Sequence, residues 1–258
     1  MTTIEENGLV SLFIENNIAV IEFFHPQSNS LPGNILRKLA TTIREADAND
    51  VVKLMVLQSK GEKVFCSGAS FNELSSINSE EEGIYFFSGF AEVINAMRTA
   101  KKLIIAKVQG KCVGGGVGLA AAADYVFALS KADIKLSELA VGIGPFVVGP
   151  AVERKLGLSA FSQLSIDAAS WRSANWAQQH GLFTEVFEDV SDLNKAADKL
   201  IGTLANSSSE AMYALKKVFW QGTEHWDTLL KERAAISGRL ILSDFSKNFI
   251  ANFKAKQQ

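Results

Sequence analysis

The stretch that decides the fold is Leu103 to Asp124, LIIAKVQGKCVGGGVGLAAAAD. Residues 103–108 are apolar and rich in β-branched side chains, which predicts a buried strand. A cluster of glycines follows, and residues 119–123 are small and apolar, which favours a tightly packed helix. A strand, a glycine turn and a helix in this order direct backbone N–H groups towards an anion. Because glycine lacks a Cβ, a ligand can lie directly on such a backbone. The sequence therefore predicts an anion-stabilising turn at its centre.

The composition excludes several classes of protein. The chain has 258 residues, of which 47% are hydrophobic, so it can bury a large core, and its net charge of −2 argues against nucleic acid as the main partner. The sequence contains no run of 18 apolar residues, so it predicts no membrane span. The first ten residues lack the pattern of a signal peptide. Two cysteines and three scattered histidines favour a reducing compartment and no metal site. We therefore expect a cytoplasmic protein.

Strands and helices alternate on both sides of the central stretch up to about residue 190. Upstream of it, we expect strands at 9–13, 18–24 and 52–58 and helices at 34–48 and 80–100. Downstream, we expect strands at 125–128, 133–136 and 183–187, a helix around 152–156 and two short helices within 167–181. Residues 189–256 have a helical pattern with breaks near Asn206 and Gly222. This order predicts an α/β core over residues 1–190 and a C-terminal helical region over residues 191–258.

Two small-residue turns are candidates for the chemistry. Residues 66–69 read Cys-Ser-Gly-Ala and residues 113–116 read Val-Gly-Gly-Gly, about forty-five residues later. Each turn follows an apolar strand pattern and opens into a helix pattern. Two backbone N–H groups that converge on one oxygen form an oxyanion hole, which stabilises developing negative charge. The same glycines are also explained by close packing between a strand and a helix.

A lone acidic residue, Glu138, interrupts the apolar segment LSELAVGIGP of residues 136–145. A solvated surface glutamate is the ordinary explanation of such a residue. Burial among the apolar neighbours would instead raise its pKa and suit the carboxyl to proton transfer. Glu138 is therefore a candidate acid/base.

The glycines also allow a different interpretation. Residues 116–121, GVGLAA, match the dinucleotide-binding fingerprint with alanine in its third place, and Glu138 follows at a suitable distance. However, these glycines begin too far beyond the predicted strand, and the unit lies in the middle of the chain. A dinucleotide site is therefore disfavoured.

Together the motifs resemble the crotonase (enoyl-CoA hydratase/isomerase) superfamily over almost the whole chain. The matching segments are, in order, His25-Pro26 to Leu31, Phe65 to Ala69, Gly110 to Gly116 with Ala123-Asp124, Ser137-Glu138 with Val141-Gly142, and Gly181-Leu182. Each is a modest signal, whereas their order and spacing are specific. The resemblance implies an α/β fold, a crotonase-like spiral of ββα units with a C-terminal helical region. It also implies a homotrimer or hexamer assembled through that region.

The resemblance further implies roles for individual residues. Ala69 and Gly115 would supply the two N–H groups that hold the thioester carbonyl of an acyl-CoA as it becomes an enolate, with Glu138 as the acid/base. The residues expected to contact the substrate or its coenzyme A are Ser28, Ser30, Leu31, Ser67, Ser70, Phe71, Gly114, Ser137, Val141 and Gly142. Coenzyme A enters as part of the substrate, so no separate cofactor is expected. Lys101, Lys102 and the C-terminal lysines are candidates for the CoA phosphates by position alone.

Departures from the family pattern bear on the reaction. The hydratases of the family hold water between two glutamates, and Gly118 stands at the position of the first. A single carboxylate is what the enoyl-CoA isomerases keep, and it can take a proton from C2 and return it at C4. The family's usual aspartate after Gly-Ala is Ser70 here. We therefore predict double-bond isomerisation of an enoyl-CoA. The alternatives are a hydratase, an acyl-CoA decarboxylase or thioester hydrolase, and a non-catalytic acyl-CoA-binding or RNA-binding relative.

Overall fold

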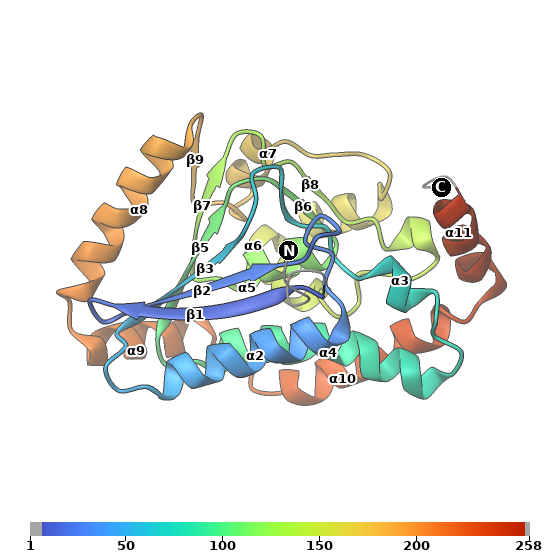
Figure 1. Ribbon diagram of the computed structural model, residues 1–258, viewed down its shortest axis with the longest axis horizontal. Helices are drawn as coiled ribbons and strands as arrows, with labels where there is room; N and C mark the ends of the chain where they lie inside the picture. The colour runs from blue at the N-terminus through green and yellow to red at the C-terminus, as the bar shows by residue number, and fades with distance from the viewer. Residues whose placement is uncertain (1–6, 256–258) are drawn as a thin grey trace.

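A six-stranded sheet forms the frame of the computed structural model, which describes residues 7–255 (Figure 1). Its strands are β1 (Leu9–Glu15), β2 (Ile18–Phe24), β3 (Leu54–Ser59), β5 (Leu103–Val108), β7 (Tyr125–Leu129) and β9 (Glu185–Phe187), in that spatial order. β1 and β2 are antiparallel, and Asn16 and Asn17 between them have positive φ angles, as a type I′ hairpin turn requires. All other neighbouring pairs in this sheet are parallel. The predicted α/β class is confirmed.

A second, smaller sheet carries the segments that the sequence analysis identified as candidates for the chemistry. It consists of β4 (Val64–Cys66), β6 (Lys111–Val113) and β8 (Ile134–Lys135), in the order β4-β6-β8, and both pairs are parallel. The carboxyl ends of parallel strands lie at the same edge of a sheet, where ligands commonly bind. The segments that begin at Ser67, Gly114 and Leu136 therefore leave the sheet side by side.

The central stretch differs from its prediction in two respects. Strand β6 separates β5 from the glycine triplet, and helix α5 (Gly115–Ala122) begins within that triplet rather than at residue 119. Glycine is a poor helix former in isolation, so the sequence favours a later start. Packing overrides this preference, because α5 is entirely buried. A Cβ on Gly116 would lie 2.4 Å from the carbonyl oxygen of Cys66, so this close approach requires glycine.

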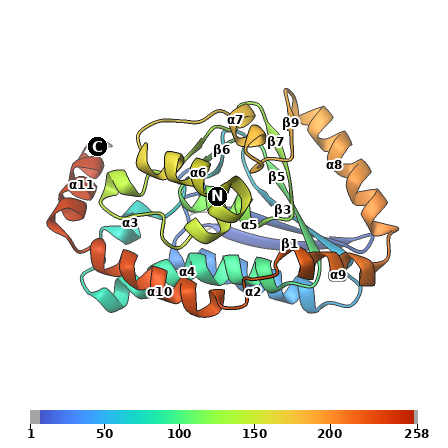
Figure 2. The same ribbon diagram turned by 180° about the vertical axis from the view of Figure 1, so that it is seen from behind.

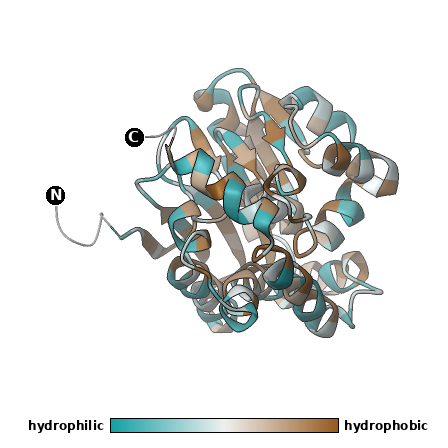
Figure 3. Cartoon of the chain, turned by 90° about the vertical axis from the view of Figure 1, so that its right-hand side faces the viewer, coloured by the Kyte–Doolittle hydropathy of each residue, from teal (hydrophilic) through white to brown (hydrophobic). Residues whose placement is uncertain are grey.

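Helices cover both faces of the large sheet (Figures 1 and 2). α2 (Gly33–Ala48), α4 (Glu80–Thr99) and α10 (Trp226–Leu240) lie together on one face, whereas α8 (Val190–Ala205) covers the other. The strand residues alternate accordingly: Leu54 and Val56 pack with α8, and Met55 and Leu57 join the main core. A sheet buried on both faces has strands that read as continuous apolar runs. The strands at the centre of Figure 3 are accordingly mostly hydrophobic.

The remaining helical elements lie outside these layers. They are α3 (Phe71–Leu74), the 3-10 turn η1 (Leu139–Val141), α6 (Gly149–Ile166), α7 (Ala174–Gln179), α9 (Ser209–Phe219) and α11 (Asp244–Ala255). The predicted breaks near Asn206 and Gly222 are confirmed, and a further break at residues 241–243 separates α10 from α11. No helix within residues 7–255 is long and apolar enough to cross a membrane.

The prediction of two short helices within residues 167–181 is wrong. Only α7 forms there, and residues 167–173 instead make turns and one antiparallel bridge. In that bridge the backbone N–H of Ile134 donates to the Arg172 carbonyl at 2.8 Å, and the Arg172 N–H donates back to Ile134 at 2.9 Å. Pairing with a strand distant in sequence has therefore replaced a local helix.

A buried ion pair attaches the C-terminal helices to the core. Lys216 Nζ of α9 lies 2.9 Å from Asp124 Oδ2, and the two side chains are 2% and 5% exposed. The carboxylate of Asp124 also accepts hydrogen bonds from the Ile104 N–H at 2.7 Å and from Trp220 Nε1 at 3.1 Å. Burial lowers the pKa of Lys216, while the carboxylate beside it acts in the opposite direction. The pair therefore fixes α9 against β5 and the residue that precedes β7.

We predict that Lys216→Met lowers the free energy of unfolding by about 3 kcal/mol, because it leaves the buried Asp124 carboxylate without its cation. Urea unfolding followed by circular dichroism measures this loss. The matched control is Lys217→Met, which changes an exposed lysine on the same helix and is expected to cost less than about 0.5 kcal/mol. Adding Asp124→Asn to Lys216→Met is expected to restore part of the loss. Equal stability of the Lys216 and Lys217 variants would contradict the structural role of the pair.

Candidate active site

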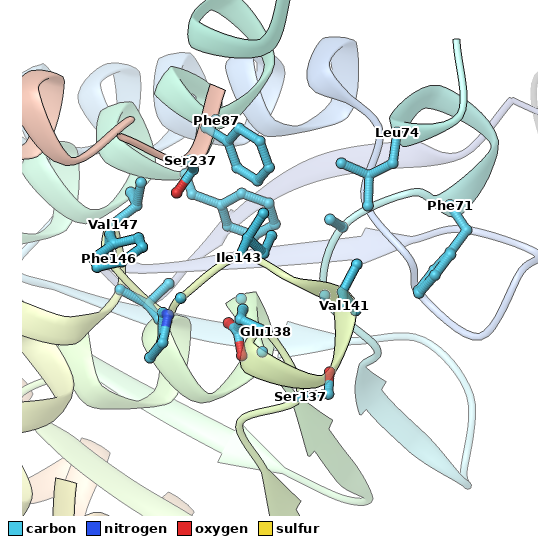
Figure 4. Close-up of a pocket in the computed structure, with 18 of the residues that line it drawn as sticks. Phe71, Leu74, Phe87, Ser137, Glu138, Val141, Ile143, Phe146, Val147 and Ser237 are labelled. Carbon is cyan, nitrogen blue, oxygen red and sulfur yellow. The ribbon is translucent and has the colours of Figure 1, made fainter. Parts of the chain in front are cut away.

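Three loops at the carboxyl edge of the small sheet bring Ala69, Gly115 and Glu138 to one cavity of about 60 Å³ (Figure 4). The first two loops touch through their backbones. A Cβ on Gly68 would lie 2.9 Å from the Val113 carbonyl oxygen and 3.3 Å from the Gly115 nitrogen, and Gly68 has a φ of +84°. Both the space and the backbone conformation therefore require glycine at residue 68.

The N–H groups of Ala69 and Gly115 have no acceptor among the described residues. Leu31 forms a parallel bridge opposite Ala69, in which the Leu31 N–H donates to the Gly68 carbonyl and the Ser70 N–H donates to the Leu31 carbonyl. The bridge leaves out the N–H of Ala69 itself. Gly115 is the first residue of α5, and the first N–H groups of a helix have no intrahelical acceptor. Two such donors on the wall of one cavity can stabilise negative charge on an oxygen atom.

Glu138 lies against the glycine turn. A Cβ on Gly114 would lie 3.0 Å from Glu138 Oε1, and Glu138 Oε2 is buried without a hydrogen-bond partner among residues 7–255. Burial raises the pKa of the Glu138 carboxyl to about 7. A carboxyl with that pKa both accepts and releases protons near neutral pH. Among the described residues that line the cavity, Glu138 alone has a titratable side chain.

Gly118, one turn further along α5, faces an apolar wall. A Cβ at this position would lie 2.5 Å from Val148 Cγ1, and Val148 belongs to the buried core. The space beside Gly118 is therefore already filled by a hydrocarbon side chain. Within residues 7–255, no three His, Cys, Asp or Glu side chains are grouped so that they could hold a metal ion.

A larger cavity of about 710 Å³ adjoins the small one. Residues Ser67, Phe71, Ser137 and Val141 line both. The walls of the larger cavity also include Lys135, Trp171 and the two aromatic residues Phe249 and Phe253 of α11. Phe253 stacks on Phe71 with ring centroids 4.3 Å apart, so α11 forms part of this wall. The two cavities together suit an elongated ligand whose small reactive end enters the smaller one.

Most of the predicted substrate contacts line these two cavities. Besides the four shared residues, Ser28 and Ser30 line the larger cavity and Gly114 lines the smaller one. Leu31, Ser70 and Gly142 lie outside both. Ser70 accepts a hydrogen bond from the Glu73 N–H at the start of α3. Gly142 ends η1 with a φ of +89°, and a Cβ there would meet Phe245 of α11.

Leu31, Ser70 and Gly142 therefore pack against the residues that line the cavities and do not line them themselves. Leu31 is fully buried and holds the Ala69 loop through the parallel bridge. That Leu31, Ser70 and Gly142 touch the substrate stays a prediction, and the structure places them behind the residues that line the cavities. A sequence motif does not tell which of its residues line a cavity and which face the core.

The positional candidates for the CoA phosphates stay predictions, and the structure gives their surroundings. Lys102 Nζ donates to the carbonyl oxygens of Ala46 and Asn49, and the backbone N–H groups of Lys101 and Lys102 donate to Asp47. Neither lysine lines the two cavities. Among the C-terminal lysines, Lys254 donates to Ser75 Oγ, and Lys256 lies outside the described residues.

The sequence analysis missed the far wall of the small cavity. That wall includes Phe87 and Phe90 of α4, Phe146 and Val147 before α6, and Ser237 of α10. The helical spacing of such residues indicates burial, but it does not distinguish a core residue from a residue that lines a cavity. Lys135, on a strand, and Trp171, in a loop, were missed because no local pattern tells that they face one cavity.

Comparisons with known proteins find relatives over nearly the whole chain. The sequence model of the enoyl-CoA hydratase/isomerase family matches residues 13–251. The chain is 24% identical over 251 residues to a probable enoyl-CoA hydratase of Bacillus subtilis, covering 96% of each chain. It is 26% identical over 247 residues to a short-chain-enoyl-CoA hydratase of Clostridium acetobutylicum, covering 95% of this chain and 94% of that one.

A similar fold is found among solved structures. The crystal structure of an enoyl-CoA hydratase from Bacillus halodurans matches with a TM-score of 0.86 at 21% sequence identity, covering 94% of this chain and 99% of that one. The match of the family model over most of the chain confirms the resemblance to the crotonase superfamily. The α/β fold with its two sheets, the paired N–H groups and the buried carboxyl thus occur in a chain that belongs to the enoyl-CoA hydratase/isomerase family.

Proposed function

We propose that the protein moves a double bond within an enoyl-CoA, with Glu138 as its single acid/base. The observation that carries this proposal is the content of the small cavity. It combines one buried carboxyl with the N–H groups of Ala69 and Gly115, and no second titratable side chain among the described residues lines it. Proton transfer on both sides of an enolate needs one base and one oxyanion hole, and no more.

The mechanism starts with the thioester carbonyl oxygen hydrogen-bonded to the N–H groups of Ala69 and Gly115. Glu138 in its ionised form takes a proton from C2 of a 3-enoyl-CoA, and the electron pair of the C–H bond moves towards the carbonyl oxygen. The resulting dienolate is held by the two N–H groups, each of which contributes roughly 3 kcal/mol to stabilising the transition state. The protonated Glu138 then donates the same proton to C4, and the electron pair of the C3–C4 double bond forms the new C4–H bond. The pair of the C1–C2 double bond of the dienolate moves to C2–C3, and the thioester carbonyl re-forms.

Coenzyme A belongs in the larger cavity under this proposal, and it serves as part of the substrate with no separate cofactor. The cavity volume of about 710 Å³ and its junction with the small cavity at Ser67 and Ser137 support this placement. Trp171 lies at its wall, with the ammonium groups of Lys111 and Lys135 4.7 Å and 5.3 Å from the indole centroid. These lysines bring positive charge to the cavity that would take the phosphates.

Hydration of a 2-enoyl-CoA is the second candidate, because the relatives described above carry hydratase names. Hydration requires a group that activates water beside Glu138. The filled space between Gly118 and Val148 leaves no room for a second acid at the expected position. Isomerisation therefore remains our first choice.

We predict that the purified protein raises the ultraviolet absorbance of a 3-enoyl-CoA, because the conjugated 2-enoyl thioester absorbs more strongly, and leaves a 2-enoyl-CoA unchanged. Glu138→Gln keeps the shape of the side chain and removes the base, so its kcat is expected to fall by about 10² to 10⁴ with acyl-CoA affinity retained. The wild-type kcat/KM is expected to rise with pH through about 7, since the base must be ionised. The residual rate of the variant is expected to show no such rise.

Other outcomes of this assay point elsewhere. A falling absorbance with the 2-enoyl-CoA would favour the hydratase. Unchanged turnover in Glu138→Gln would refute the role of Glu138. No change in absorbance with either substrate, with acyl-CoA binding intact, would favour a decarboxylase, a thioester hydrolase or a non-catalytic relative.

We predict that Gly115→Val weakens acyl-CoA binding by at least tenfold in calorimetry, because a Cβ at Gly115 would lie 2.0 Å from the Phe90 ring and push it into the cavity. Gly202→Val is the matched control, because a Cβ there meets nothing within 4 Å. Circular dichroism of both variants checks that they fold. Wild-type affinity in a folded Gly115→Val protein would contradict the proposed oxyanion hole.

We also propose that the helical region 191–258 assembles the chain into a homotrimer or a pair of trimers. Its described part exposes three apolar side chains on α9, Leu215, Val218 and Phe219, which are 50%, 65% and 45% exposed. Sedimentation equilibrium is expected to give about three or six times the chain mass of 28.0 kDa. Val218→Asp is expected to shift this mass downwards. Lys38→Asp, an exposed substitution on α2 outside this region, is expected to leave the mass unchanged. A stable wild-type monomer would contradict the proposal.

A further inference from the structure

Three serines line the small cavity, and the proposed mechanism uses the hydroxyl of none of them. Ser67 and Ser137 also line the larger cavity, whereas Ser237 of α10 lines the small one alone. In Figure 4 this serine lies beside Phe87, Phe146 and Val147, away from Phe71 and Leu74. The residues shared with the larger cavity do not include it. Ser237 therefore lies at the end of the cavity that is remote from the opening towards the larger one.

Ser237 is only 1% exposed, it lines the cavity, and its hydroxyl takes part in none of the side-chain hydrogen bonds found within residues 7–255. Helical serines often donate to the carbonyl four residues earlier, as Ser165 does to Phe161 at 2.7 Å. Buried polar groups in proteins are nearly always hydrogen-bonded. A buried hydroxyl that reaches a cavity and lacks a protein partner is thus available to a ligand.

Close helix packing brings Ser237 to this place. α10 crosses α4 at Gly83 and Gly238, where a Cβ on Gly83 would lie 2.7 Å from the Gly238 Cα. The absence of both side chains lets the two helices approach until Ser237 and Phe87 share the same cavity wall. Arg98 of α4 binds Asp227 of α10 at 3.0 Å and fixes the same pair of helices further along.

The size and charge of the cavity limit what Ser237 can bind. A volume of about 60 Å³ holds roughly four water-sized groups, which corresponds to a short acyl chain. No lysine, arginine or histidine is among the described residues that line it, and Glu138 would repel an anion. A carboxylate at the far end would thus be buried without a counter-charge. The matching ligand group is neutral.

We propose that Ser237 hydrogen-bonds a neutral polar group, a hydroxyl or a carbonyl, at the distal end of a short acyl chain. This inference rests on the proposed function only in placing the acyl group in the small cavity. Ser237 is then a specificity-determining residue, which selects among acyl-CoA substrates without taking part in proton transfer.

The test compares two saturated thioesters of equal length, freshly prepared 4-hydroxybutyryl-CoA and pentanoyl-CoA, by calorimetry. The wild-type protein is expected to bind the hydroxylated thioester about tenfold more tightly, because pentanoyl-CoA leaves Ser237 unpaired. Ser237→Ala is expected to remove or reverse this preference while it retains affinity for pentanoyl-CoA. Thr228→Ala, an exposed substitution on the same helix, is the matched control and should keep the wild-type ratio.

The outcomes separate this inference from the proposed function. Equal affinity of the wild-type protein for both thioesters, or a ratio unchanged in Ser237→Ala, would overturn the role of Ser237 and leave the isomerase proposal intact. A preference that Ser237→Ala abolishes would support it, whether or not the 3-enoyl-CoA assay shows turnover. Failure to bind either thioester would overturn both proposals.

Discussion

Parallel pairing in the small sheet is the constraint on which the site depends. Cys66, Cys112 and Ile134 lie opposite one another across β4, β6 and β8. Ala69 lies three residues after Cys66, and Gly115 lies three residues after Cys112. Glu138 lies four residues after Ile134. The register of a sheet with only eight strand residues thus determines which backbone N–H groups face the carboxyl. A shift by one residue would turn the strand side chains to the opposite face.

The small sheet keeps this register because glycine lets its loops touch. At Gly68, Gly114 and Gly116 the neighbouring atoms come so close that any Cβ would collide or nearly collide. The same closeness leaves two N–H groups and one carboxylate oxygen without partners among residues 7–255. Unpaired buried polar groups cost stability, and the rest of the structure must offset this cost. Such groups are informative about function, because a ligand is what would satisfy them.

Segments far along the chain complete the cavities. α10 supplies Ser237 through its close crossing with α4, and α11 supplies Phe253, which stacks on Phe71. The buried pair of Asp124 and Lys216 attaches α9, and through it the following helices, to the strands of the large sheet. The space available to a ligand is therefore set partly by helices that follow Glu138 by about a hundred residues in the sequence.

Local patterns in the sequence were sufficient for the long strands and helices, because an apolar run or a period of 3.6 is visible over six or more residues. Glu138 was identified as a candidate acid because it stands alone in the apolar segment 136–145. The strands β4 and β6 are too short to show a period, so the second sheet was not foreseen. Only the tertiary structure decided that Val148 fills the space at Gly118, that Leu31 supports the site without lining it, and that Ser237 lines the cavity. These facts depend on distances between elements remote in sequence, which local patterns do not encode.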